Sequence, residues 1–425
     1  MRQQAPKTRC KRPLNGPHRK KIMNLIEAIA AQADGIAALR RDIHAHPETA
    51  FEEHRTADLV ARKLAEWGIP CERGLGGTGV VGIVKGRDGG QCGRAIALRA
   101  DMDALPMSEA NTFAHASRAP GKMHACGHDG HTAMLLAAAQ YLAAHRDFDG
   151  TIYLFFQPAE EGGFAGAAAM LRDGLFDQFP AEAVFGLHNW PGMPAGALAA
   201  SAGPVMASSN QFRITIHGKG GHAALPHLCV DPVPIACQMA LAFQTIVTRN
   251  RNPVDAAVIS VTMIHAGETS NIIPGECLLQ GTVRAFTAPT LDLIERRMRE
   301  IAEGFCASFG ARCTFEFLRQ YPPTINTEYE AAFARRVMQS VAGDALTLPQ
   351  EPALGAEDFA FMLQARPGAY GFIGNGNGEH RPPGSSGPCT LHNPNYDFND
   401  ALIPIGATYW VRLAQAWLAH QPPDR

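Results

Sequence analysis

Residues 123–132, with the sequence MHACGHDGHT, bring a thiol, imidazoles and a carboxylate close together along the chain. Cys126 lies two residues before His128, and the alanine- and leucine-rich segment that follows predicts a helix. A cysteine in this position is a nucleophile, a small buried thiol or a metal ligand. The start of a helix favours a thiolate, because the helix dipole is positive there. Residues elsewhere in the chain are needed to decide among the three.

Acidic and histidine side chains also follow three apolar runs. The run AIALRA is followed by Asp101 and Asp103. The run TIYLFF is followed by Glu160 and Glu161, and the run AVFGL by His188. Ligands of α/β sheets bind beyond the carboxyl ends of the strands, so these side chains are expected to meet at one edge of a sheet.

Together these residues predict a site for two metal ions. Thiolate, imidazole and carboxylate groups suit Zn, Mn, Co or Ni better than Ca or Mg. Five donors are too many for one tetrahedral ion with an open position, and they fit two ions about 3.5–4 Å apart that share a thiolate. Glu160 would then be free to move a proton from water to a leaving amine. The predicted ligands are Cys126, His128, Glu161, His188 and His392.

The elements that must position these residues follow an α/β pattern. Apolar strands alternate with helices, among them helices predicted at 24–46 and 54–67, which indicates a sheet covered on both faces. Residues 206–319 instead have the order β-α-β-β-α-β, which is typical of a ferredoxin-like α+β unit. We therefore predict a catalytic α/β domain, residues 23–205 and 320–425, with this smaller domain inserted.

Two other motifs resemble sites but are better explained by structure. GTGVVG, residues 77–82, matches a dinucleotide fingerprint, yet it precedes a strand-like run and so predicts a turn. Cys389 lies three residues before His392 and is an alternative ligand, but we expect a structural thiol. The Pro- and Ser-rich segment around it, 375–389, is predicted to be an exposed loop that changes substrate access.

Composition excludes several classes of protein. Residues 1–21 carry eight Lys and Arg and no acid, whereas the remaining chain has 30 basic and 40 acidic side chains, a poor balance for binding nucleic acid. No apolar run reaches the ~18 residues that span a membrane, so we expect no membrane partner.

Ten cysteines without a CxxC pair, and no secretory signal, predict a cytoplasmic protein. Residues 1–22 are expected to be a disordered extension before a start at Met23, with a targeting or polyanion-binding arm as the alternative.

The chain resembles the amidohydrolase branch of the aminoacylase-type metallopeptidases. That branch contains hippurate hydrolases, N-acyl-amino-acid deacylases and plant auxin-conjugate hydrolases. The matching stretches run in family order from about residue 38 to 400 and are specific when taken together. They are LRRDIHAHPE, LRADMDALPM, MHACGHDGHT, FFQPAEEG, GLHNWPGMPAG, GKGGHAALPH, TSNIIP, GTVRAF, GAEDFA and LHNPNYDFND.

The resemblance implies roles for individual residues. The five predicted ligands match the metal-binding positions of the family, and Glu160 matches its general acid/base. Asp103 matches an aspartate that orients a group in the site, and His222 matches a histidine that stabilises the oxyanion. Asn271 and Arg284 match polar positions that face the carboxylate end of the substrate. The resemblance also implies a homodimer formed through residues 206–319.

These observations predict a metal-dependent amidohydrolase. It would cleave N-acyl amino acids, such as hippurate-like substrates, with a metal-activated water and Glu160 as general acid/base. One alternative is an amidase in which Cys126 is the nucleophile, which would leave the two glutamates and His392 without a role. The other is a metal- or amino-acid-binding protein without catalytic activity. The presence of Glu160 argues against it, because a site without activity often loses its base.

Overall fold

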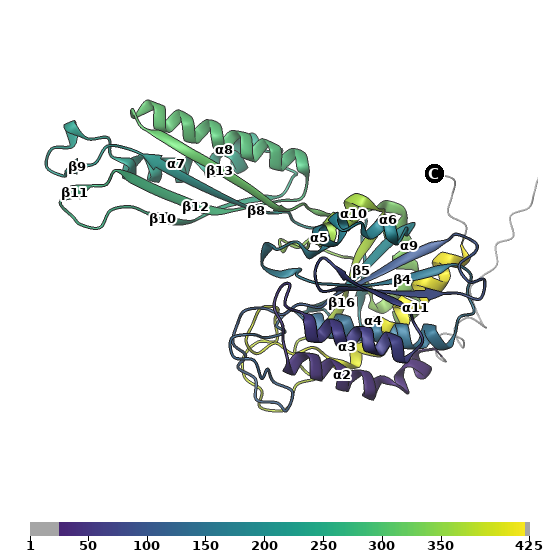
Figure 1. The fold of residues 1–425 in the computed structure, drawn as a ribbon. Coiled ribbons are helices and arrows are strands. Elements are labelled where there is room, and N and C mark those ends of the chain that lie inside the picture. The colour runs from purple at the N-terminus through teal and green to yellow at the C-terminus, as the bar shows by residue number, and fades with distance from the viewer. Residues whose placement is uncertain (1–24, 421–425) are drawn as a thin grey trace, which may run out of the picture.

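The computed structural model describes residues 25–420, so the predicted extension at 1–22 lies outside the described residues. Within them the larger sheet has eight strands, and β4, β3, β5 and β16 form its parallel centre (Figure 1). The strand order is β1 (Cys71–Leu75), β2 (Gly79–Lys85), β4 (Thr151–Gln157), β3 (Ala95–Asp101), β5 (Ala183–Pro191), β16 (Gly368–Gly376), β6 (Leu198–Ala199) and β15 (Thr347–Leu348).

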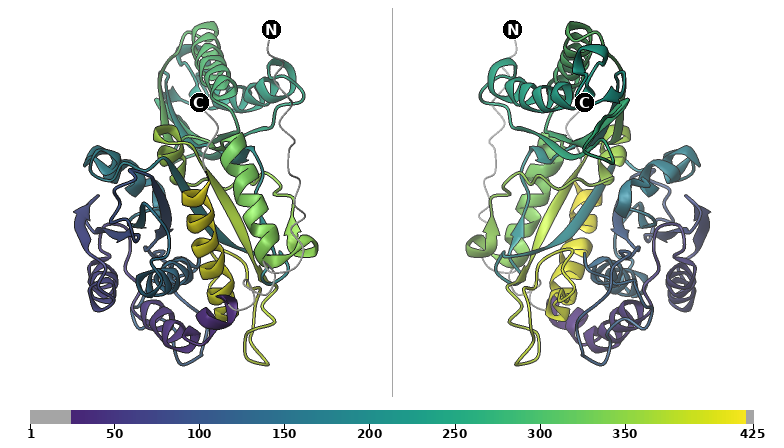
Figure 2. Two further views of the ribbon diagram at one scale, coloured as in Figure 1. Left: turned by 90° about the vertical axis from the view of Figure 1, so that its right-hand side faces the viewer. Right: turned by 90° about the vertical axis from the view of Figure 1, so that its left-hand side faces the viewer.

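Helices cover both faces of this sheet, as the alternation of strands and helices predicts. One face packs against α2 (Ala33–Ala45), α3 (His54–Glu66), α4 (His128–Ala144), α9 (Glu328–Ala342) and α11 (Ile403–Ala419). The other face packs against α5 (Gly166–Arg172), α6 (Leu175–Gln178) and α10 (Phe359–Ala365). Two of the long helices, α9 and α11, lie side by side (Figure 2).

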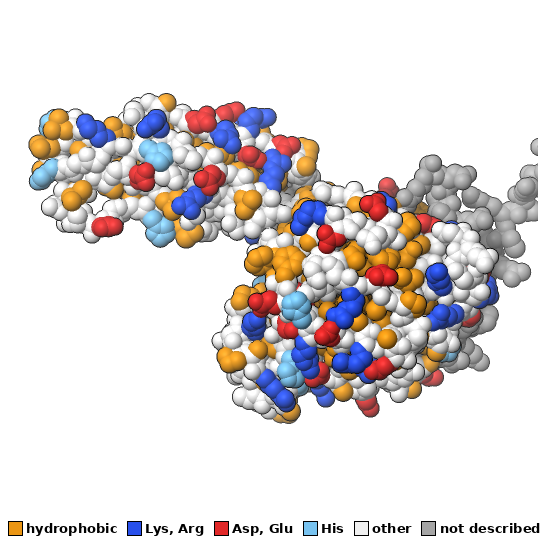
Figure 3. All heavy atoms as spheres, in the orientation of Figure 1, with side chains coloured by type: hydrophobic (Ala, Val, Ile, Leu, Met, Phe, Trp, Pro, Cys, Tyr) orange, Lys and Arg blue, Asp and Glu red, His pale blue; other side chains and the backbone are white. Residues whose placement is uncertain are grey.

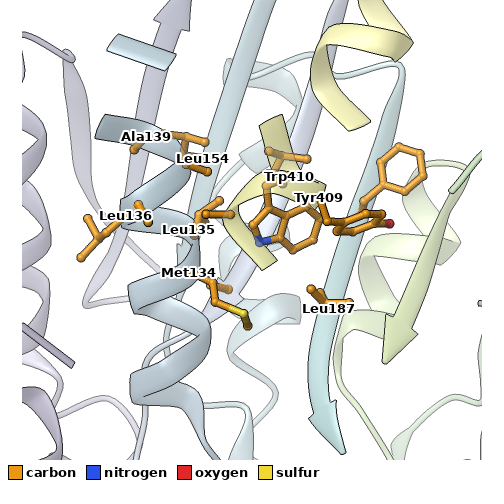
Figure 4. Packing of buried hydrophobic residues seen from close by; sticks show 14 of the residues in the cluster. Met134, Leu135, Leu136, Ala139, Leu154, Leu187, Tyr409 and Trp410 are labelled. Carbon is orange, nitrogen blue, oxygen red and sulfur yellow. The ribbon is translucent and has the colours of Figure 1, made fainter. Parts of the chain in front are cut away.

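The core of the first face is formed by α4, the sheet and α11. Trp410 is 1% exposed and lies between α4 and the strands (Figure 4). Alanines and leucines of α4 allow the helix to approach the sheet closely, which explains why this helix is buried almost all round. The residues labelled in that view are Met134, Leu135, Leu136, Ala139, Leu154, Leu187, Tyr409 and Trp410.

A second unit, residues 209–321 and called the inserted unit below, projects from the larger body (Figures 1 and 3). Its antiparallel sheet has the order β10-β12-β8-β13, and α7 and α8 cover one face around a separate core. Its elements are β8 (Ser209–His217), β9 (Gly221–His222), α7 (Pro232–Thr245), β10 (Ala257–His265), β11 (Ile272–Ile273), β12 (Glu276–Ala285), α8 (Ala288–Ser308) and β13 (Arg312–Tyr321).

The predicted fold class is confirmed, since the inserted unit has the β-α-β-β-α-β order within an α/β chain. The helix predicted at 24–46 is wrong in part, because a turn at 31–32 separates two helices and α2 begins only at Ala33. The pattern also missed β6, β15, β7 (Gly203–Met206) and β14 (Thr324–Asn326), which are too short for a periodic signal. None of the helices between residues 25 and 420 is long and apolar enough to cross a membrane.

A buried arginine joins α2 to two segments that border the predicted site. Arg40 is 1% exposed, and its guanidinium lies 3.4 Å from Asp129, 3.2 Å from Asp397 and 2.7 Å from Asp400. Asp129 follows His128 at the start of α4, and the other two aspartates precede α11. The three carboxylates are compensated by this one cation together with nearby histidines.

We expect Arg40→Met to lower the free energy of unfolding by about 3–5 kcal/mol, because the substitution leaves buried carboxylates without their cation. Arg41→Met is the matched control, since Arg41 is 53% exposed and pairs with Asp400 at the surface. Its loss should cost at most about 1 kcal/mol. Urea unfolding followed by tryptophan fluorescence measures the free energy of unfolding of both variants. Equal losses would contradict the stabilising role of buried Arg40.

Candidate metal centre

The predicted ligands converge at the carboxyl edge of the parallel strands. Neighbouring strands β4, β3 and β5 run in the same direction, so Glu161, Asp103 and His188 reach one edge. Cys126 and His128 reach the same edge from the start of α4. His392 comes from the loop before α11, and its backbone N–H donates to the carbonyl of Ala125 at 2.8 Å.

The donor atoms form two groups that share the thiol. Cys126, His128 and His188 make one group, and in it Sγ lies 3.4 Å from Nε2 of His188. Cys126, Glu161 and His392 make the other, and in it Nε2 of His392 lies 3.2 Å from Oε1 of Glu161. Within each group all the donor atoms lie within 4.8 Å of one another. This arrangement has the size of a dinuclear site with a shared thiolate ligand.

Hydrogen bonds fix the ring orientation of the two buried histidines in the predicted ligand set. Nδ1 of His128 donates to Oδ1 of Asp103 at 3.1 Å, and Nδ1 of His188 donates to the carbonyl of Asn189 at 2.6 Å. Nε2 of His128 is buried and has no hydrogen-bond partner among the described residues. A buried imidazole nitrogen of this kind is costly unless it binds a metal ion, so the residues fit divalent cations.

Asp103 orients two of the predicted ligands at once. Its Oδ1 accepts from His128, and its Oδ2 accepts the backbone N–H of Glu161 at 2.9 Å. Asp103 is 1% exposed and lies behind these ligands, so its place fits the predicted orienting role.

The charge around Cys126 opposes a free thiolate. Burial, together with the carboxylates of Glu161 and Glu160, raises the pKa of Cys126 well above its usual range. The positive end of α4 therefore does not activate the thiol by itself, contrary to the expectation from the sequence. A nucleophilic cysteine needs a lowered pKa, whereas a thiol between divalent cations is deprotonated by them.

Glu160 has the surroundings of an acid/base group. It is 6% exposed, and burial together with the carboxylates of Glu357, Glu161 and Asp358 raises its pKa well above the usual range. The backbone N–H of Asp358 lies 3.4 Å from Oε1 of Glu160. A carboxyl group with a raised pKa can both accept and return a proton near neutral pH.

Arg99 is a residue of this site that the sequence reasoning missed. It is 2% exposed, and its guanidinium lies 2.7 Å from Asp101, 2.8 Å from Glu357 and 3.1 Å from Asp358. Asp101 also accepts a hydrogen bond from Nδ1 of His131 at 2.6 Å. Arg99, its carboxylate partners and His131 therefore form one buried polar network beneath the ligands. The available signal was an arginine inside an otherwise apolar strand, since such a residue is rarely buried without partners.

The polar residues predicted on the inserted unit lie away from this centre. His222 is exposed on β9, and the carbonyl of Asn271 accepts the N–H of Ala223 at 3.0 Å in the same two-stranded ladder. That ladder lies at the end of the inserted unit remote from the larger sheet (Figure 1). Arg284 is half-buried on β12. Within the described residues, none of the three lines the cavity beside Glu160.

A cavity of about 590 Å³ opens beside the predicted ligands. Trp190, Met206 and Leu391 give it an apolar wall, and the amides of Gln211 and Gln320 give it a polar one. The loop 375–389 contributes no residue to the lining, so the cavity does not support its predicted effect on access. Cys389 lies outside both donor groups and donates to the carbonyl of Asp397 at 3.3 Å, as a structural thiol does.

The fold and the site have relatives among known proteins. The sequence profile of Peptidase family M20/M25/M40 matches residues 97–416, and the chain belongs to this family. The chain is 38% identical over 397 residues to the hippurate hydrolase of Campylobacter jejuni, covering 93% of this chain and 100% of that protein. It is 37% identical over 390 residues to an IAA-amino acid hydrolase of Arabidopsis thaliana, covering 91% and 87%.

Among solved structures, the chain is similar to the YXEP protein of Bacillus subtilis, which is described as a dinuclear metal-binding peptidase of the M20 family. The two share 32% identity and superimpose with a TM-score of 0.79, over 92% of this chain and 99% of that one. Family and donor set together indicate that this protein binds divalent metal ions.

We expect Asp103→Asn to weaken metal binding by about 10- to 100-fold, because the new NH₂ group faces either the N–H of His128 or that of Glu161. Competition with a chromogenic chelator gives the dissociation constants. Asp147→Asn, an exposed carboxylate on the same domain, is the control and should bind as the parent does. An unchanged constant for Asp103→Asn would remove Asp103 from the orienting role.

Proposed function

We propose that this protein is a metal-dependent amidohydrolase that cleaves the amide bond of N-acyl amino acids, including hippurate-like substrates. The observation that carries the proposal is a buried carboxyl group, Glu160, beside a thiol, imidazole and carboxylate donor set in an open cavity. The names of the relatives, hippurate hydrolase and IAA-amino acid hydrolase, support amide hydrolysis of acylated amino acids.

Two divalent transition-metal ions of the Mn, Zn, Co or Ni type complete the proposed site. When bound, such ions polarise a carbonyl oxygen and lower the pKa of a nearby water. The donor set of soft and borderline atoms supports ions of this type over Ca or Mg. The proposed ligands are Cys126, His128, Glu161, His188 and His392.

The side chains of the site then divide the work. Glu160 accepts the proton of the attacking water and returns it to the nitrogen of the departing amino acid. Asp103 keeps the imidazole of His128 and the backbone of Glu161 in place. The apolar wall around Trp190 suits an apolar acyl group. The indole ring is held in position because it stacks on Phe372, with ring centroids 4.3 Å apart.

The alternative with Cys126 as the nucleophile has less support. The raised pKa of that thiol opposes attack, and the neighbouring carboxylates would repel a thiolate. A binding protein without activity needs no buried acid/base carboxyl group, so Glu160 argues against it.

We further propose that residues 206–319 form a lid and dimerisation domain and that the protein is a homodimer. His222 would stabilise the oxyanion at the site of the partner subunit, and Asn271 and Arg284 would face the carboxylate end of the substrate. The remote position of the β9–β11 ladder supports delivery between subunits. Met263 and Ile264 on the edge strand β10 are 43% and 45% exposed, which supports a contact there.

Glu160→Gln and Glu161→Gln test the core of the proposal, because the two adjacent residues have different roles. Glu160→Gln should keep its metal ions but lower kcat for hippurate-like substrates by about 10²–10⁴, since only the proton carrier is lost. Glu161→Gln should lose metal as well as rate. Elemental analysis and initial rates measure both variants, and the reverse pattern would exchange the assignments.

Removal of metal should abolish hydrolysis, and addition of Mn, Zn, Co or Ni should restore it. Alkylation of Cys126, followed by mass spectrometry, gives a readout besides activity. The thiol should react slowly in the metal-bound protein and faster after chelation, because a ligand sulfur is shielded. Full activity in a sample shown to be free of metal would favour the cysteine nucleophile.

Complementation tests the homodimer. An inactive His222→Ala protein mixed with an inactive Glu160→Gln protein should recover part of the activity, because some heterodimers contain one intact composite site. His222→Ala alone should lower kcat with its metal content unchanged. Subunit exchange is verified by tags on the two proteins. Exchange without recovered activity would place His222 outside the partner's site.

A further inference from the structure

Glu53 is a buried carboxyl group that has no part in the roles described so far. It lies in the segment PETAFEEHRT, just before α3, and is 0% exposed. Its Oε1 accepts the backbone N–H of Phe51 and that of Ala159, each at 2.9 Å. Its Oε2 accepts the hydroxyl of Thr78, which belongs to the GTGVVG turn. One side chain therefore joins three segments that are far apart in sequence.

Both amides that share Oε1 belong to residues with left-handed backbone. Phe51 has φ 62° and Ala159 has φ 52°. Residues with a Cβ adopt this region only when other interactions impose it, whereas glycine adopts it freely. Ala159 is the residue immediately before Glu160, so its φ and ψ fix the direction in which the next side chain leaves the turn.

The remaining contacts of the turn hold the backbone on both sides of Ala159. The carbonyl of Ala159 accepts the N–H of Gly166 at 2.9 Å, and the carbonyl of Glu160 accepts the hydroxyl of Tyr321. The N–H of Ala159 is held by Glu53. Ala159 is itself fully buried, and Glu53 does not line the cavity.

We propose that Glu53 is a positioning residue that holds Ala159 in its left-handed conformation and so aims the carboxyl group of Glu160 into the site. This inference rests on the acid/base role proposed above for Glu160. Glu53 touches neither the cavity nor the predicted metal ligands, and its hydrogen bond to the turn is the one from the backbone N–H of Ala159.

To hold the turn, the side chain of Glu53 needs its hydrogen-bond acceptor atoms rather than its negative charge. Burial raises the pKa of Glu53 to about 7, so the carboxyl group carries its charge at some cost near neutral pH. A glutamine has one oxygen for the two backbone amides, and its NH₂ group can donate to Thr78, whose hydroxyl also accepts. The conservative variant Glu53→Gln should therefore keep the turn.

The test compares kcat in four variants of the metal-loaded protein. Glu53→Ala should lower kcat about tenfold or more, with KM changed less than about twofold, because the penalty for left-handed alanine is no longer offset. Adding Ala159→Gly should raise kcat at least about threefold above that of Glu53→Ala, since glycine reaches the conformation unaided. Glu53→Gln should retain most of kcat. Glu52→Ala is the matched control, because Glu52 is exposed and pairs with Lys122.

If Glu53→Ala does not fold, Glu53→Asp takes its place, because its shorter side chain cannot hold both amides yet leaves a smaller cavity. Failure of Ala159→Gly to raise kcat in either background would overturn the proposal, as would a Glu53→Gln protein as slow as Glu53→Ala. Failure of the Glu160 role is separate, since Glu160→Gln would then remain active whatever the Glu53 variants do.

Discussion

Six carboxylates are buried at one edge of the larger sheet, and their burial shapes the arrangement of the site around them. Each of these groups is costly to remove from water unless a cation or a hydrogen-bond donor lies against it. Arg99 compensates for three of them, N–H groups of His128 and Glu161 donate to Asp103, and the predicted divalent ions would compensate for Glu161. The carboxylates are Asp101, Asp103, Glu160, Glu161, Glu357 and Asp358.

The same edge also concentrates backbone strain. Among residues 25–420, four non-glycine residues have positive φ, and they are Phe51, Ala159, Ala165 and His392. Two of them share the carboxyl group of Glu53, and the N–H of Ala165 lies 3.4 Å from the hydroxyl of Tyr321. His392 is a predicted ligand. Such conformations persist only where surrounding contacts impose them, which is typical of functional sites.

The larger body and the inserted unit each have their own hydrophobic core. The larger sheet packs between two helical layers and carries the donor atoms at one edge, while the inserted unit packs α7 and α8 on one face of its own sheet. Tyr321, at the end of β13, contacts the backbone of Glu160, so the connection between the two units borders the acid/base group. Units with separate cores can move relative to one another, as a lid must.

Local sequence patterns are enough to predict the fold class and the chemistry of the donor set. Polar residues after apolar runs are local signals that place Asp103, Glu161 and His188 at one sheet edge, and the helix period places Cys126 before a helix. Contacts in the folded chain, by contrast, place Arg99 beneath that edge, give Ala159 its left-handed backbone and set His222 apart from its own site. Charge compensation, imposed backbone conformation and the separation of units depend on contacts between distant segments, and a local pattern does not encode them.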